Sequence, residues 1–122
     1  MIQKIDLIMN TIKGMDIKNK LRLGICIFSS SYINTNYNKA QIFNKMDAKL
    51  KEIDKEYTIS FRGIEDHPIV LFAASKIMEL TKEEQNRIAM YLVNILNCIW
   101  NLRNYVNCDI IYKVPSKLLG LI

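Results

Sequence analysis

The stretch LRLGICIFSSSYI, residues 21–33, decides whether the chain is all-helical or contains a sheet. Its apolar residues alternate as in a half-buried strand, at Leu21, Leu23, Ile25 and Ile27. Apolar residues also recur along one helical face, at Ile17, Leu21, Ile25, Phe28 and Tyr32. Because β-branched residues favour a strand and Gly24 weakens a helix interior, the sequence predicts a strand over Leu21–Phe28.

Two further segments have strand patterns. YTISFRG, residues 57–63, alternates large apolar and polar residues before a glycine, and CDIIYKV, residues 108–114, is a short apolar run ended by Pro115. A chain of 122 residues is long enough for one core and too short for two. We therefore expect a compact single α+β domain over residues 1–122, predominantly helical, with a small sheet of about three strands: Leu21–Phe28, Tyr57–Arg62 and Cys108–Val114.

The rest of the chain reads mostly as helix. Apolar residues recur at helical spacing over residues 1–15 and 39–55, and the nearly all-apolar segment 69–80 is typical of a buried helix. The tract SSSYINTNYN, residues 29–38, is typical of a polar loop. The firmest helix start is TKEE, in which Thr81 and Glu84 form a capping box ahead of an apolar run. We expect this helix to continue to about Tyr105.

This long, central C-terminal helix carries two apolar stripes, which place it at the centre of the domain or at the seam of a homodimer. The first stripe comprises Ile88, Leu92, Ile95, Ile99, Leu102 and Val106, and the second comprises Ala89, Val93, Leu96 and Trp100. The remaining flank is polar, and we expect its asparagines to be partly exposed. The residues predicted to bind a protein partner are Arg87, Asn94, Asn97, Asn101, Asn104 and, beside them, Trp100.

Composition limits the compartment and the partners. The net charge is +5, which permits attraction to nucleic acid, to an anionic membrane or to an acidic partner without specifying any of them. Three cysteines form no even disulfide framework, so reduced thiols in a cytoplasmic protein are the better interpretation. No signal peptide and no apolar run of membrane-spanning length is expected.

Catalytic and cofactor motifs are missing from the sequence. Its four glycines form no phosphate-binding loop, and one histidine with scattered cysteines lacks the ligand spacing of a zinc site. That histidine, His67 in EDHP, would be a general base only if a Ser or Cys nucleophile reached it, and nothing in the sequence brings one there. We expect no enzyme activity, cofactor or metal.

The function predicted from these features is non-enzymatic binding or sequestration of a protein partner. The chain is short, has no known motif and is rich in Ile, Asn and Lys, whose codons are A/T-rich. Viruses, phages and mobile elements use chains of this kind as inhibitors of host or defence proteins. The alternative is a basic nucleic-acid-binding regulator that uses the lysine-rich helix 39–55. Its candidate residues are Lys39, Lys45, Lys49, Lys51 and Tyr37. A third alternative is a nucleotide or small-ligand pocket with Arg87 or Arg103 beside a phosphate.

Overall fold

The computed structural model describes residues 3–54, 57 and 67–100, except the side chain of Trp100. Helices account for 77% of these residues, and no strand or sheet occurs among them. The five helices in this part of the chain are α1 (Lys4–Lys13), α2 (Ile17–Ser29), α3 (Lys39–Ile53), α5 (Pro68–Ile77) and α6 (Lys82–Trp100). None of them is both long and apolar enough to cross a membrane.

The α+β prediction is wrong, because the stretch predicted as strand Leu21–Phe28 is the body of α2. This helix is buried on several sides, since it contacts α3, α5 and α6. Leu21, Leu23, Ile25 and Ile27, which alternate, are therefore all inside the protein, and so are the members of the helical face that belong to α2, whereas Tyr32 lies beyond the end of α2 and is 76% exposed. A helix packed on several sides has few polar positions, so its sequence pattern resembles that of a buried strand. The other two predicted strands lie outside the described residues, apart from Tyr57, which belongs to no helix or strand.

Gly24 is explained by helix packing. A Cβ added at this position would overlap the side chain of Met46 on α3, lying 2.8 Å from its Cε and closer still to its Sδ. The missing side chain therefore lets α2 and α3 approach closely, which outweighs the cost of a glycine inside a helix.

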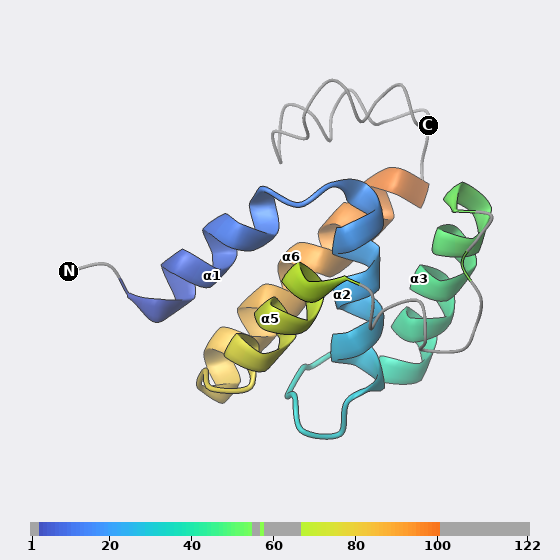
Figure 1. The fold of residues 1–122 in the computed structure, drawn as a ribbon. Helices are drawn as coiled ribbons and strands as arrows, with labels where there is room; N and C mark the ends of the chain where they lie inside the picture. Colours follow the sequence, from blue (N-terminus) through green and yellow to red (C-terminus); the bar gives the residue numbers. More distant parts are fainter. Residues whose placement is uncertain (1–2, 55–56, 58–66, 101–122) are drawn as a thin grey trace.

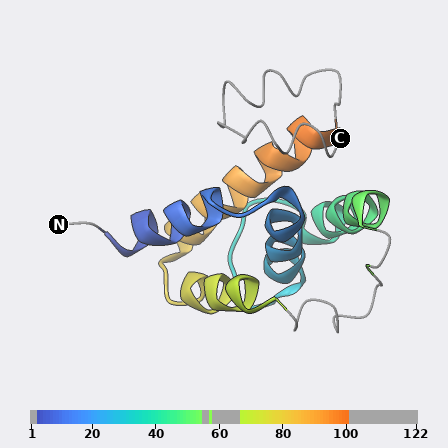
Figure 2. The same cartoon turned by 45° about the horizontal axis from the view of Figure 1, so that its top comes forward.

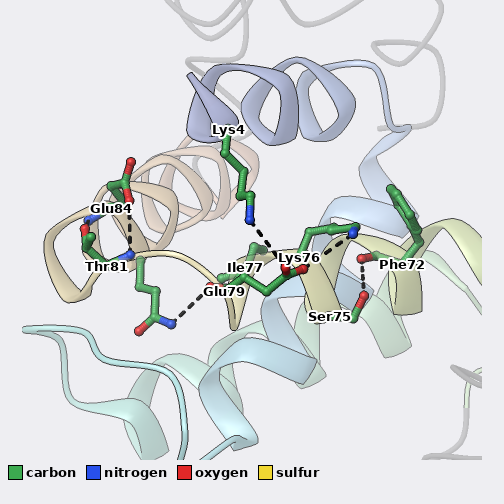
Figure 3. Close-up of polar contacts among 9 residues, drawn as sticks. Lys4, Phe72, Ser75, Lys76, Ile77, Glu79, Thr81 and Glu84 are labelled. Atoms are coloured by element: carbon green, nitrogen blue, oxygen red, sulfur yellow. Dashed lines mark hydrogen bonds and ion pairs between the residues drawn. The ribbon is translucent and has the colours of Figure 1, made fainter. Parts of the chain in front are cut away.

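The helix boundaries follow local capping signals. The predicted capping box is confirmed: the Glu84 N–H donates to Thr81 Oγ1 at 3.2 Å, and the Thr81 N–H donates to Glu84 Oε1 at 3.0 Å (Figure 3). Asp16 caps α2 by accepting from the Asn19 N–H at 2.8 Å. Asn38 caps α3, and the preceding residues form the predicted loop. Pro68 opens α5, where its missing N–H costs nothing.

In the arrangement of the helices, α2 lies between α3 and α5 (Figure 1). Helix α1 packs on α5, and α6 contacts both α2 and α3 (Figure 2). The part of each apolar stripe of α6 that lies in the described residues is covered within the chain: Ile88, Leu92, Ile95 and Ile99 on one, Ala89, Val93 and Leu96 on the other, each at most 4% exposed. These residues therefore pack α6 into its own domain, and the described part of each stripe offers no dimer seam.

Candidate interaction surfaces on α5 and α6

The polar flank of α6 is present as a surface. Arg87 and Asn97 are exposed and Asn94 is half-buried, and the three residues follow one another at helical spacing along one face. Met90, 44% exposed, lies between them. Asn101, Asn104 and the side chain of Trp100 lie outside the described residues. The structure thus brings three of the six predicted partner-binding residues together on one face.

The loop before α3 is fastened to the first turns of α6 by side-chain amides. Gln85, only 3% exposed, accepts from the Asn34 N–H at 2.9 Å and donates from Nε2 to the Ile77 carbonyl at 3.0 Å. Asn86 Oδ1 accepts from the Asn36 N–H at 2.9 Å. These contacts satisfy backbone groups in a segment without helical hydrogen bonds, so the loop is a fixed part of the surface.

Beside this loop lies a polar pocket of about 280 Å³. Its lining residues offer amide or hydroxyl groups and one charge of each sign: Asn34, Thr35, Asn36, Lys82, Glu83 and Asn86. The small-ligand alternative named Arg87 and Arg103, of which Arg87 does not line this pocket and Arg103 lies outside the described residues. Among the described residues, Arg87 is therefore not placed to bind a phosphate in this pocket.

The predicted nucleic-acid residues do not form one basic surface. Lys49 is buried, with 4% exposure, and its Nζ lies 3.2 Å from Glu52 Oε2. Lys51 pairs with Asp47 at 2.9 Å, and Lys39 donates to the Ser30 carbonyl at 2.6 Å. Of the other two predicted residues, Lys45 is exposed, whereas Tyr37 packs against the core. A phosphate backbone would find only part of the predicted positive charge available.

The largest departure from expectation is α5, which was predicted to be a buried helix. Only Val70, Ala73 and Ile77 are buried on it. Large apolar side chains on its outer side, including the turn that follows, are between 43% and 55% exposed: Ile69, Leu71, Phe72 and Met78. Its only polar side chains are Ser75 and Lys76. The helix thus has apolar side chains around most of its circumference. The described part of the chain covers only one side of it.

Charged side chains of both signs lie along the edge of this outer face that adjoins α1 (Figure 3). Lys76 Nζ lies 5.6 Å from the centroid of the Phe72 ring and 3.4 Å from Glu79 Oε2. Lys4 on α1 reaches the same carboxylate at 3.3 Å. The hydrogen bond from Lys4, followed by the nearby charges, lowers the pKa of Glu79. The two lysines therefore favour the ionised form of Glu79 at the edge of an apolar surface.

Buried titratable groups act structurally. Lys20 on α2 is 2% exposed and donates to Tyr91 Oη of α6 at 2.9 Å, and burial lowers its pKa. Burial also raises the pKa of the Cys26 thiol to about 11, so this cysteine is a poor nucleophile at neutral pH.

Among the described residues, no three His, Cys, Asp or Glu side chains are placed to hold a metal ion. His67 precedes α5 and caps it with no side-chain hydrogen bond.

Comparisons with protein-family models, curated proteins and solved structures gave no match. The function is therefore inferred from the surfaces of this chain.

Sequence reasoning missed the outer face of α5 although a signal was present. The segment IVLFAASKI has almost no polar residue on any flank, so a helix there has apolar side chains left over once one side is packed.

Proposed function

We propose that this chain is a non-enzymatic protein-binding module whose apolar contact surface is the outer face of α5. The observation that carries the proposal is the concentration of Ile69, Leu71, Phe72 and Met78 on this short segment, each about half exposed. Apolar patches of this kind on soluble proteins mark interaction sites.

The size of the patch is appropriate for a protein contact. Large apolar side chains present roughly 200 Å² each when fully accessible, so four half-exposed ones leave on the order of 400 Å² uncovered in total, with Leu71 and Phe72 at the centre of the face and Ile69 and Met78 on its two flanks. The largest apolar patch of a typical monomer is about 300–600 Å² and is often functional. Aromatic and methionine side chains, here Phe72 and Met78, are enriched at the centres of protein interfaces.

The rim supports the same function. Lys4, Lys76 and Glu79 pair with one another at the edge of the patch, so the apolar surface has a charged, polar rim. An apolar centre with a polar rim is the usual composition of a protein interface. Binding or sequestration of a partner, as an inhibitor of a larger protein would perform it, requires no catalytic group. The free cysteines Cys26 and Cys98 support action in a reducing compartment such as the cytoplasm.

Nucleic-acid binding is the second candidate, and it is weaker because Lys49 is buried and Lys51 is paired with Asp47. The salt dependence of nucleic-acid binding distinguishes the two candidate functions. Binding to a nucleic-acid panel should be weak and should disappear as salt rises, because only nonspecific phosphate attraction is available. Tight, sequence-dependent binding that persists at physiological salt would favour the nucleic-acid function.

The protein-binding proposal is tested by affinity capture from cells of the source organism with the wild type and two charge-matched variants. Phe72→Glu places a carboxylate in the patch, and Met90→Glu places one on α6 at similar exposure. We expect the partner captured by the wild type and by Met90→Glu to be lost with Phe72→Glu. Equal capture by all three proteins would refute the α5 surface. Loss with Met90→Glu alone would assign binding to the polar flank of α6.

A further inference from the structure

We infer that the partner of the outer face of α5 presents an amphipathic helix with acidic side chains beside its apolar ones, an inference that rests on the proposed function and names the chemistry of the partner. The edge of the face carries unequal numbers of positive and negative charges. Lys4 Nζ lies 3.3 Å from Glu79 Oε1, and Lys76 Nζ lies 3.4 Å from Glu79 Oε2. Neither lysine makes another ion pair with a residue that the structure describes. Two ammonium groups thus share one carboxylate, and one positive charge is left in excess.

This excess charge lies beside the apolar centre of the face and is accessible. The side chains form a row from α1 to the face, in the order Lys4, Glu79, Lys76 and Phe72 (Figure 3). Lys76 Nζ lies 5.6 Å from the centroid of the Phe72 ring. The side chains of Lys4 and Lys76 are 54% and 42% exposed. An ammonium group has three N–H donors, so each lysine can bind a second carboxylate while it stays close to Glu79.

These distances define where the partner's acidic side chains must stand. An ion pair needs an N···O distance of about 4 Å or less, so a carboxylate bound to Lys76 lies within about 10 Å of the Phe72 ring. One turn of an α-helix rises about 5.4 Å. An acidic residue three or four positions from an apolar residue that packs on Phe72 meets this condition. We therefore expect Asp or Glu one turn away from an apolar residue of the partner helix.

The apolar part of the surface has the spacing that packs against a helix. Pro68, Leu71, Phe72 and Ser75 are all exposed and stand at positions i, i+3, i+4 and i+7 of α5, the spacing of a ridge that fits between the ridges of another helix. Beyond the charged edge, α1 adds Leu7, which is 54% exposed and shares a flank with the lysine three positions before it. Apolar contacts are thus offered on both sides of the excess charge.

The contact is small, so its charges matter for the choice of partner. The four apolar side chains leave on the order of 400 Å² uncovered, and covering them buries roughly 800 Å² on the two partners together. Weak, transient interfaces lie below about 1,200 Å². Rim charges of opposite sign raise the rate of association and exclude partners of like charge. The net charge of +5 acts in the same direction over a longer range, because it attracts an acidic partner.

An anionic bilayer is also acidic and apolar, but it fits this edge less well. Lipid head groups would surround the whole edge with negative charge and repel the Glu79 carboxylate, which lies between the two lysines. A helix can place its carboxylates on the lysines and away from Glu79. The charges of both signs at this edge therefore favour a protein helix over a lipid surface.

Selection from a displayed library of random peptides tests the inference, with roughly 16 residues each, or more than four helical turns. Peptides that bind the full wild-type chain and lose binding with Phe72→Ser should be severalfold enriched in Asp and Glu one turn from an apolar residue. In fluorescence anisotropy, Lys4→Gln combined with Lys76→Gln should weaken their binding about tenfold, because two exposed ion pairs are lost. Lys13→Gln combined with Lys45→Gln removes as much charge from exposed positions elsewhere, and it should keep most of the affinity. Circular dichroism of each variant verifies the fold.

The outcomes separate this inference from the proposed function. Phe72-dependent peptides that are neutral or basic would overturn the acidic partner and leave the proposed function standing. The same holds for peptides that bind the Lys4→Gln, Lys76→Gln variant as tightly as the wild type. A selection without any Phe72-dependent peptide would refute the α5 surface and both proposals with it. Co-sedimentation of the wild type with phosphatidylcholine–phosphatidylserine vesicles, lost with Phe72→Ser, would overturn the partner helix and assign the face to a lipid surface.

Discussion

Replacing Gly24 by alanine should destabilise the wild type and stabilise a variant in which Met46 is shortened. The added Cβ would overlap Met46 Sδ and lie 2.8 Å from Cε, in a part of the core where Met46 is fully buried. Overpacking of this kind costs about 1–3 kcal/mol. Replacing a helical glycine by alanine contributes about 1 kcal/mol in the opposite direction. The net effect of Gly24→Ala on the free energy of unfolding should therefore be a loss of about 0–2 kcal/mol.

The sign should reverse in the Met46→Ala background. That variant alone should lose about 2–5 kcal/mol through the cavity that it leaves. Adding Gly24→Ala then fills part of the cavity without a clash, so a gain of about 1 kcal/mol is expected from helix propensity. Urea denaturation followed by circular dichroism at 222 nm measures all four proteins of this double-mutant cycle.

Gly14→Ala is the matched control, because a Cβ there meets only the Asn10 and Thr11 carbonyl oxygens at an ordinary 3.6 Å. This variant should be neutral or up to about 1 kcal/mol more stable. If Gly24→Ala stabilised the wild type as much as it stabilises Met46→Ala, the close approach of α2 and α3 would be refuted. The all-helical packing described for α2 would then need revision.

Three further perturbations test single contacts. Thr81→Ala removes the cap of α6 and should cost about 1 kcal/mol in urea denaturation; no loss would argue against the capping box. Gln85→Leu leaves the Ile77 carbonyl and the Asn34 N–H without their partner and should cost about 1–3 kcal/mol; an unchanged midpoint would show that the loop is not fastened to α6. Because burial lowers the pKa of Lys20, the unfolded chain binds that proton more tightly, so Lys20 contributes stability that increases as pH rises toward 10.5. The raised pKa of Cys26 acts in the opposite direction above pH 9.0, so the comparison is made below that pH, where Lys20→Met should reduce the rise in stability with pH; an identical pH dependence of the two proteins would contradict this.

What the sequence predicts well is set by local chemistry. The start of α6 depends on Thr81 and Glu84, three residues apart, and such a motif acts whatever the rest of the fold does. The strand predicted over Leu21–Phe28 fails for the opposite reason. Whether alternating apolar residues form a strand or a fully surrounded helix depends on how many neighbours pack around them, and no local pattern contains that number.

In the candidate site too, features set by local helix geometry could be predicted, and features set by packing could not. Periodicity placed Arg87, Asn94 and Asn97 on one flank of α6, and the structure has them there because helix geometry alone decides it. Periodicity did not show that Lys49 is buried, since a long aliphatic stem can be covered while its ammonium pairs with Glu52. It also did not show that Phe72 is left uncovered, because exposure depends on which helices pack against α5.

Hydroxyl-radical footprinting of the methionines tests the central claim, that the outer face of α5 is a protein-binding surface, most directly and without any mutation. Met78 of the α5 segment and Met90 of α6 are 51% and 44% exposed, and Met46 is buried as an internal reference. In dilute purified protein, Met78 and Met90 should oxidise at comparable rates. In extracts of the source cells, oxidation of Met78 should fall severalfold while Met90 is unchanged. Protection of Met90 with Met78 unaffected, or of neither residue, would contradict the account.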